Sequence, residues 1–227
     1  MIKNIIIGFL LILANSTFAF EESKVINIGG KYITVSSPYG FHIETDKEML
    51  EVLESLFPKD KVSLKVVISP NIDNEKYRSI MIATIPQLKD KNIFKEEYKY
   101  ISKILVEQQY TMLNQYKDMV NEGVEYAATA FNNEFNNNTV ASVDELTTLG
   151  VFIDKENVIS MAVIVSGQIT SDDFSDNTPQ ISTVSFLRIK NRLILAYLYS
   201  DYIDSKDILW AKSKTKELVE LLLKVNN

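Results

Sequence analysis

The chain has 227 residues, a formal net charge of −6 and 46% hydrophobic residues. An acidic chain without a Lys/Arg cluster repels phosphate backbones, which disfavours nucleic-acid binding. The absence of cysteine excludes disulfides, Cys-liganded metals and thiol nucleophiles. With seven Gly and five Pro, the composition indicates a folded chain and not a disordered one.

The first 19 residues have the three parts of a secretory signal peptide. Lys3 supplies the positive start, an apolar run follows at 5–14, and Thr17-Phe18-Ala19 places small residues where a signal peptidase cuts. The apolar run is shorter than the roughly 20 residues that a spanning helix needs. We expect cleavage after Ala19, a periplasmic or secreted bacterial protein without stable membrane insertion, and one globular domain at 20–227. An uncleaved anchor is the alternative.

Short strands dominate the predicted first part of this domain. Alternating residues around Gly29-Gly30 indicate a hairpin, and Thr45 or Asp46 is suited to cap a helix. Turn residues at 70–74 join two strand-like stretches that should pair antiparallel. The predicted elements in chain order are strands at 24–28, 31–36 and 41–44, a helix at 47–57, and strands at 62–69 and 78–85.

The longest periodic segment runs from Ile93 to about Val124. Its apolar residues recur at helical spacing, which predicts one long amphipathic helix with a break or an end at Gly123. We interpret its aromatic stripe as packing against a sheet, with a ligand groove as the alternative. The Asn-rich tract 131–139 favours a loop.

Beyond residue 140 the chain is predicted to be mostly strand. Two hairpins are expected, followed by a helix at 205–225 that Ser205 caps and in which Leu218 and Leu222 face the core. Strands come in hairpins and do not alternate with helices, so the fold class is α+β: a mostly antiparallel sheet flanked by helices, including one long central helix and a C-terminal helix. The hairpin strands are 147–153 with 158–169 and 181–189 with 193–199, separated by a polar loop at 170–180.

His42 is the only histidine, so any histidine-based catalysis depends on it. On a strand, His42 and Glu44 share one face and form a candidate acid/base pair, although a solvent-facing pair explains them as well. One histidine and no cysteine argue against zinc. Phosphate-binding glycine loops and a G-x-S-x-G motif are absent, so the evidence for an enzyme is weak, and no cofactor is implied.

Two further groups of residues are candidate sites. Asp172, Asp173 and Asp176 form the densest set of oxygen ligands, but they lack the calcium-loop pattern and its final Glu, so a solvated loop is the alternative. Tyr and Trp are favoured binding anchors, and four of them gather near the C-terminus, where a recognition groove competes with ordinary packing. These aromatic residues are Tyr197, Tyr199, Tyr202 and Trp210.

Two stretches resemble the Mog1/PsbP-type α/β/α sandwich family. One is Tyr39-Gly40-Phe41-His42-Ile43 after a proline; the other runs from Phe186 to Asn226, where Asp207-Ile208-Leu209-Trp210 opens the last helix. The order of strands and helices is similar over most of the mature chain. The resemblance implies a sandwich scaffold with a non-catalytic binding or assembly role, and it assigns no site residue.

Three functions therefore remain open on sequence grounds. The first is an exported, non-catalytic binding or assembly module whose partner is another envelope protein. The second is a hydrolase or transferase built on carboxylates with His42 as its base. The third is a small-ligand binder that uses the Tyr-rich end of the sheet. A pocket that joins His42 to carboxylates would favour the second, and an aromatic cleft the third.

Overall fold

The computed structural model describes residues 22–227 except 56, 72–75, 110–112, 136–137 and 172–173. The predicted signal peptide, residues 1–19, lies outside the described residues. Among the helices of the described ranges, none combines the length and the apolar character needed to cross a membrane.

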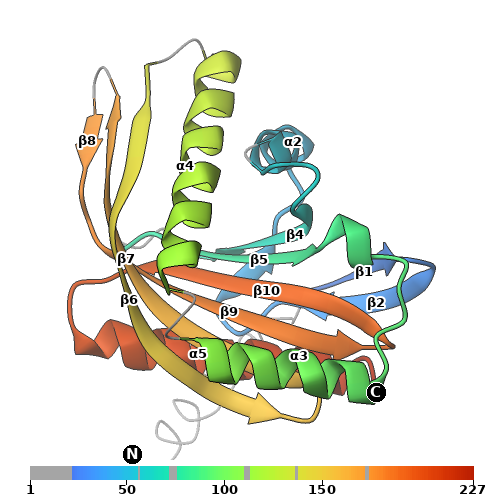
Figure 1. Ribbon diagram of the computed structural model, residues 1–227. Coiled ribbons are helices and arrows are strands. Elements are labelled where there is room, and N and C mark those ends of the chain that lie inside the picture. The colour runs from blue at the N-terminus through green and yellow to red at the C-terminus, as the bar shows by residue number, and fades with distance from the viewer. Residues whose placement is uncertain (1–21, 56, 72–75, 110–112, 136–137, 172–173) are drawn as a thin grey trace, which may run out of the picture.

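An eight-stranded antiparallel sheet forms the centre of the fold (Figure 1). The strand order is β3-β4-β5-β10-β9-β7-β6, and β8 pairs with β7. A separate two-stranded hairpin consists of β1 (Ser23–Ile28) and β2 (Lys31–Ser36), as the sequence predicted. The strands of the large sheet are β3 (Phe41–Ile43), β4 (Ser63–Pro70), β5 (Arg78–Thr84), β6 (Val140–Lys155), β7 (Val158–Ser171), β8 (Phe174–Asp176), β9 (Gln180–Ile189) and β10 (Arg192–Asp201).

The α5 face of the sheet carries the largest apolar cluster. Alternation along β5 and β10 points Ile80, Ile82, Ile194 and Leu198 to this side, where all are fully buried. Helix α5 (Ser205–Lys224) and the β1–β2 hairpin cover them. Leu218 and Leu222 of α5 lie in the same cluster, which confirms the predicted apolar stripe of this helix.

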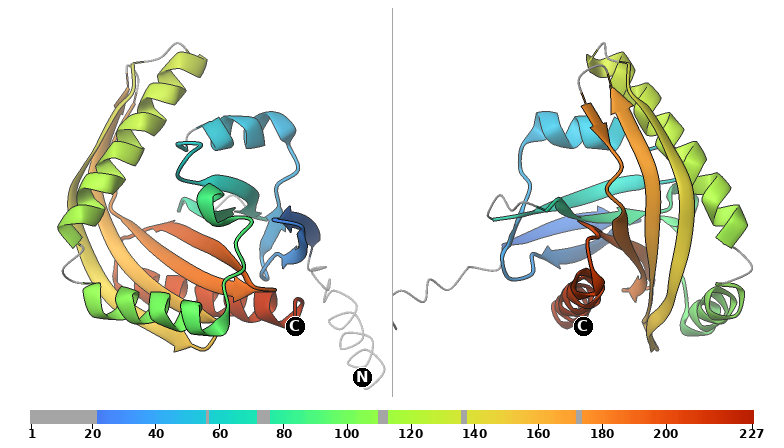
Figure 2. Two further views of the ribbon diagram at one scale, coloured as in Figure 1. Left: turned by 45° about the vertical axis from the view of Figure 1, so that its right-hand side comes forward. Right: turned by 90° about the vertical axis from the view of Figure 1, so that its left-hand side faces the viewer.

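The opposite face is covered by three helices (Figures 1 and 2). Helix α3 (Lys95–Gln108) buries Leu105 against Ile159 and Met161 of β7. Helix α4 (Leu113–Phe135) packs along β6, and α2 (Lys47–Ser55) packs against β4 and α4. The sheet thus lies between two layers, and the α+β class with a mostly antiparallel sheet and a C-terminal helix is confirmed.

The central helical segment differs from the prediction. The single helix expected at 93–124 is two helices, α3 and α4, and Gly123 lies inside α4. The Asn-rich tract, predicted as a loop, continues α4 as far as Phe135. Asn132 explains part of this result, because its side chain bonds both the amide and the carbonyl of Thr139 at the start of β6. Contacts with β6 outweigh the local turn preference of asparagine.

Two boundaries in the C-terminal half also differ. Strands β6 and β7 are longer than predicted and meet in a shorter turn, and β8 occupies part of the predicted loop 170–180. Asp204, and not Ser205, caps α5: its carboxylate accepts from the amide of Lys206, and Asp207 bonds back to the Asp204 amide. Asp and Ser are comparable N-caps, and the carboxylate of Asp204 also suits the positive end of the helix dipole.

Candidate functional site

Aromatic side chains gather at one end of the sheet, which we call the aromatic end. Here β4 and β10 finish, β5 begins and the chain turns into α5. The Asp201 amide donates to the Tyr77 carbonyl, and the Tyr77 amide donates to the Asp201 carboxylate. The Tyr202 amide donates to the Pro179 carbonyl, so these segments are held together. Five of the eleven tyrosines and the only tryptophan belong to this end: Tyr39, Tyr77, Tyr197, Tyr199, Tyr202 and Trp210.

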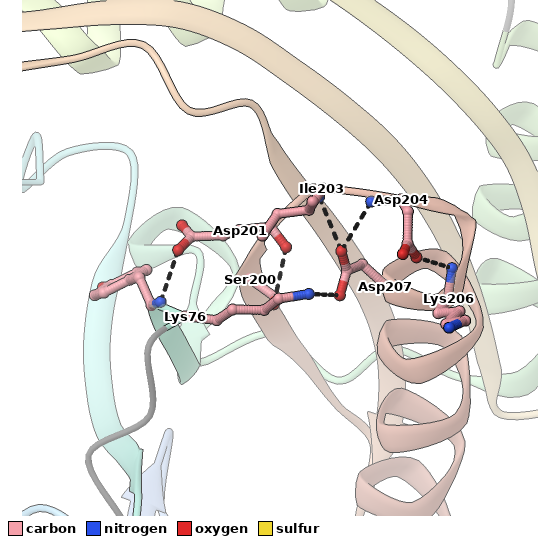
Figure 3. A network of polar contacts seen from close by, with 8 residues as sticks. Lys76, Ser200, Asp201, Ile203, Asp204, Lys206 and Asp207 are labelled. Atoms are coloured by element: carbon pink, nitrogen blue, oxygen red, sulfur yellow. Dashed lines mark hydrogen bonds and ion pairs between the residues drawn. The ribbon is translucent and has the colours of Figure 1, made fainter.

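A polar network fixes the start of α5 against β5 (Figure 3). The Lys76 ammonium lies 2.5 Å from Asp207 Oδ1, and Asp207 Oδ2 accepts from the amides of Ile203 and Asp204 at 2.8 and 3.1 Å. Burial by itself raises the pKa of Asp207, but the bonds from Lys76 and the two amides outweigh it and lower the pKa to about 2. The network holds the first turn of α5, and so Trp210 one turn later, in a fixed position.

Arg78 lies over the ring of Trp210 on the α5 face. Its guanidinium carbon is 4.0 Å from the ring centroid of Trp210. The ring centroids of Trp210 and Phe41 are 6.4 Å apart. Within the described part of the chain, the buried Nε of Arg78 has no hydrogen-bond partner, and the guanidinium has no carboxylate within 4.0 Å. The stack therefore places a guanidinium cation on an aromatic platform.

A row of tyrosines lies on the other side of the same strands. Tyr197 and Tyr199 are stacked with centroids 6.2 Å apart and planes 15° from parallel. Burial raises the pKa of Tyr199, and the neighbouring phenols of Tyr197 and Tyr77 raise it further. Tyr77 immediately precedes β5 and lies near the tyrosine row, since its phenol acts on the pKa of Tyr199, whereas Arg78 begins β5 and stacks on Trp210.

Large hydrophobic side chains remain exposed around this end. Tyr39, Tyr77, Ile203 and Leu209 have 73, 54, 67 and 69% of their surface exposed. Tyr39 is held beside α5 because its amide donates to Glu217 and its carbonyl accepts from Lys214. Exposed apolar groups beside half-buried aromatic anchors and a cation are the composition of protein-binding surfaces.

The four aromatic residues named from the sequence separate into two pairs. Trp210 and Tyr202 pack against the core cluster of the α5 face. Tyr197 and Tyr199 form the tyrosine row on the opposite face. Sequence reasoning missed Arg78, Tyr77 and Tyr39, because their roles follow from tertiary pairing with β10 and α5 and no local motif marks them.

His42 and Glu44 lie together, with His42 Nε2 3.8 Å from Glu44 Oε2. The other ring nitrogen, Nδ1, faces Asn71 Oδ1 at 3.2 Å. Ser69 is the cross-strand neighbour of His42, but both nitrogens of the ring already face other side chains. Among the described residues, no serine or threonine hydroxyl is hydrogen-bonded to the His42 ring.

The aspartates proposed as calcium ligands do not form a described site. Asp172 and Asp173 lie outside the described residues. The Asp176 carboxylate accepts from the amide of Thr178 at 2.8 Å, and its bonds to Thr178 lower its pKa. In the described part of the chain, no three acidic or histidine side chains are grouped as a metal site would need.

Comparison with known proteins yields structural likeness only. No family profile and no curated protein matches the sequence. The Saccharomyces cerevisiae Ran-binding protein Mog1p is 13% identical with a TM-score of 0.34, covering 91% of this chain and 94% of that one. A mutant of the protein Mog1 is 14% identical with a TM-score of 0.33, covering 90% and 94%. Ran binding is named for the yeast protein and is not carried over to this chain.

Proposed function

We propose that this chain is an exported bacterial envelope protein that acts as a non-catalytic binding module for another envelope protein. The observation that carries the proposal is the Arg78–Trp210 stack with its exposed hydrophobic surroundings. Trp, Tyr and Arg dominate the residues whose removal weakens protein interfaces most. A surface that combines all three residue types with exposed apolar side chains supports a protein partner.

The export part of the proposal rests on the sequence of residues 1–19. A positive start, a short apolar run and small residues at the cut are the parts of a cleavable signal. Mass spectrometry of the protein from its native host should find Phe20 as the first residue. Recovery of a chain that begins at Met1 from the cytoplasm would refute export.

The binding part is tested by retrieving the partner from the host's own envelope fraction with tagged full-length chain. Tyr77→Ala is a clean probe, because it removes an exposed phenol and leaves the backbone bonds to Asp201 in place. Tyr100→Ala on α3 is the matched control, since this tyrosine is 67% exposed and lies on another element. We expect Tyr77→Ala to weaken recovery of a specific partner and Tyr100→Ala to leave it unchanged. Equal recovery with both variants would refute the proposed surface.

A further inference from the structure

A hollow of about 240 Å³ lies at the other end of β4 and β5, away from the aromatic end. The β1–β2 turn forms one wall, the two strands form another, and the chain after the short helix η1 (Pro86–Leu88) closes the third. The lining residues that matter are Gly29, Gly30, Lys65, Thr84, Lys89 and Asp90.

A buried arginine, Arg192, is hydrogen-bonded to the β1–β2 turn that forms one wall of this hollow. Arg192 is 5% exposed, and its guanidinium donates to the carbonyls of Ile28, Gly29 and Lys91 and to the side-chain oxygen of Asn92. All of these acceptors are neutral. No carboxylate lies within 4.0 Å of Arg192 in the described residues, so its charge is not balanced by an acid.

Two lysines add to this positive charge. The pairing of β4 with β5 shifts register between Leu64 and Val66, which makes Lys65 the extra residue of a β-bulge. Bulges redirect side chains, and this one places Lys65 in the lining of the hollow. Lys89 lines it from the third wall, and neither lysine has an ion pair within 4.0 Å in the described part of the chain. Asp90 is the single acidic residue of the lining.

The backbone at Gly29 makes the arrangement possible. Its φ of +54° lies in the left-handed region, and a Cβ there would overlap the Lys89 carbonyl oxygen and come within 2.7 Å of Arg192 Nε. Glycine lets the turn lie directly against both groups. The β1–β2 turn therefore packs directly against Arg192 and the Lys89 segment beside the hollow.

We propose that this hollow binds an oxyanion of the phosphate class between Lys65 and Lys89. Each guanidinium nitrogen of Arg192 already donates to an oxygen of the chain, so the pair of parallel donors that binds a carboxylate at two points is already engaged. Ammonium groups act as point charges that suit a tetrahedral, multiply charged anion. The phosphate belongs either to a free small molecule or to a lipid headgroup. This site is separate from the proposed protein-binding surface.

The test titrates the full chain with inorganic phosphate at low ionic strength, followed by calorimetry. We expect saturable binding that the double variant Lys65→Gln/Lys89→Gln weakens by about 10-fold or more. The matched control is Lys206→Gln/Lys216→Gln, two exposed lysines of α5 whose loss changes the net charge equally. Equal weakening in both double variants, or no saturable binding by the unmodified chain, would overturn the proposal.

Two additional arms complete the experiment. Lys89→Gln alone, at an exposed side chain, replaces the double variant if the latter unfolds, and it should still weaken phosphate binding severalfold while the control does not. Vesicles of phosphatidic acid, compared with phosphatidylcholine vesicles, distinguish the sources. If the chain binds phosphatidic acid vesicles and not phosphatidylcholine vesicles, the ligand is a lipid headgroup. If it binds inorganic phosphate but neither kind of vesicle, the ligand is a free molecule.

Discussion

At the scale of single residues, Asp207 joins the strands to the last helix. Its carboxylate forms an ion pair with Lys76, which precedes β5, and accepts hydrogen bonds from two amides of the turn after β10. These bonds stabilise the charged carboxylate, which is why its pKa falls although burial acts in the opposite direction. The same residue completes the capping box of α5 with Asp204.

The stability contributed by Asp207 should depend on pH. Its pKa of about 2 in the folded state lies below its value of about 4 in an unfolded chain. The contribution is therefore complete above pH about 4 and is lost as the pH falls toward 2. Urea unfolding at pH 7 should show that Asp207→Asn lowers the free energy of unfolding by about 1–3 kcal/mol. Between pH about 4 and 2, the free energy of unfolding of this variant should fall less than that of the unmodified chain. Lys76→Gln should reduce the same pH dependence in part. If the free energy of unfolding of both variants fell with pH as in the unmodified chain, this role of Asp207 would be contradicted.

His42 is a second residue whose removal is informative. Its ring faces Glu44 and Asn71 at the edge strand, while Phe41 and Ile43 supply the buried side of β3. We expect His42→Ala to change the free energy of unfolding by no more than about 0.5 kcal/mol and to leave partner binding intact. A hydrolase activity of the unmodified chain that disappears in His42→Ala, with the melting temperature unchanged, would contradict the non-catalytic proposal.

At the scale of elements, α5 connects the aromatic end to the core. One stripe of the helix buries Ala211, Leu218 and Leu222 against the sheet. A second stripe faces β3 and β5, where Trp210 contacts Phe41 and Arg78. At its end, Asn226 bonds the amide and carbonyl of Thr34, which ties the helix to β2. Any shift of α5 would therefore move the proposed binding surface.

The two sides of α5 should respond differently to truncation. Leu222→Ala should lower the free energy of unfolding by about 2–5 kcal/mol, because Leu222 is fully buried in the main cluster. Lys216→Ala, on the exposed side, should change it by no more than about 0.5 kcal/mol. Urea melts measure both values, and equal costs at the two positions would show that the helix is rotated from the phase described.

At the scale of the whole molecule, sequence patterns were sufficient for the fold class and for most elements. Alternation and turn residues located the hairpins, and the apolar spacing located α5 with Leu218 and Leu222 inside. The α3–α4 break was missed, because a continuous apolar stripe does not show where a helix changes direction. The end of α4 was missed because Asn132 bonds the main chain of Thr139, just before β6, and local sequence preferences do not include these bonds.

The candidate site was only partly accessible from the sequence for the same reason. Trp210 and the tyrosines of β10 stood out by type and spacing. Arg78, however, becomes a candidate only through its position in the fold. It pairs with Ser200 of β10, and its guanidinium lies over Trp210 of α5. A stack between residues so far apart in the chain depends on the complete topology, and a single sequence carries no local signal for it.

The central claim is that the aromatic end binds a protein partner in the envelope. It is tested most directly by placing a photo-cross-linking amino acid at Tyr77, Leu209 and, as a control, Tyr100 in the chain expressed in its own host. We expect one discrete protein adduct from Tyr77 and Leu209, none from Tyr100, and loss of that adduct when Arg78→Gln is added. Adducts of equal yield at all three positions, or an adduct that Arg78→Gln leaves unchanged, would contradict the claim.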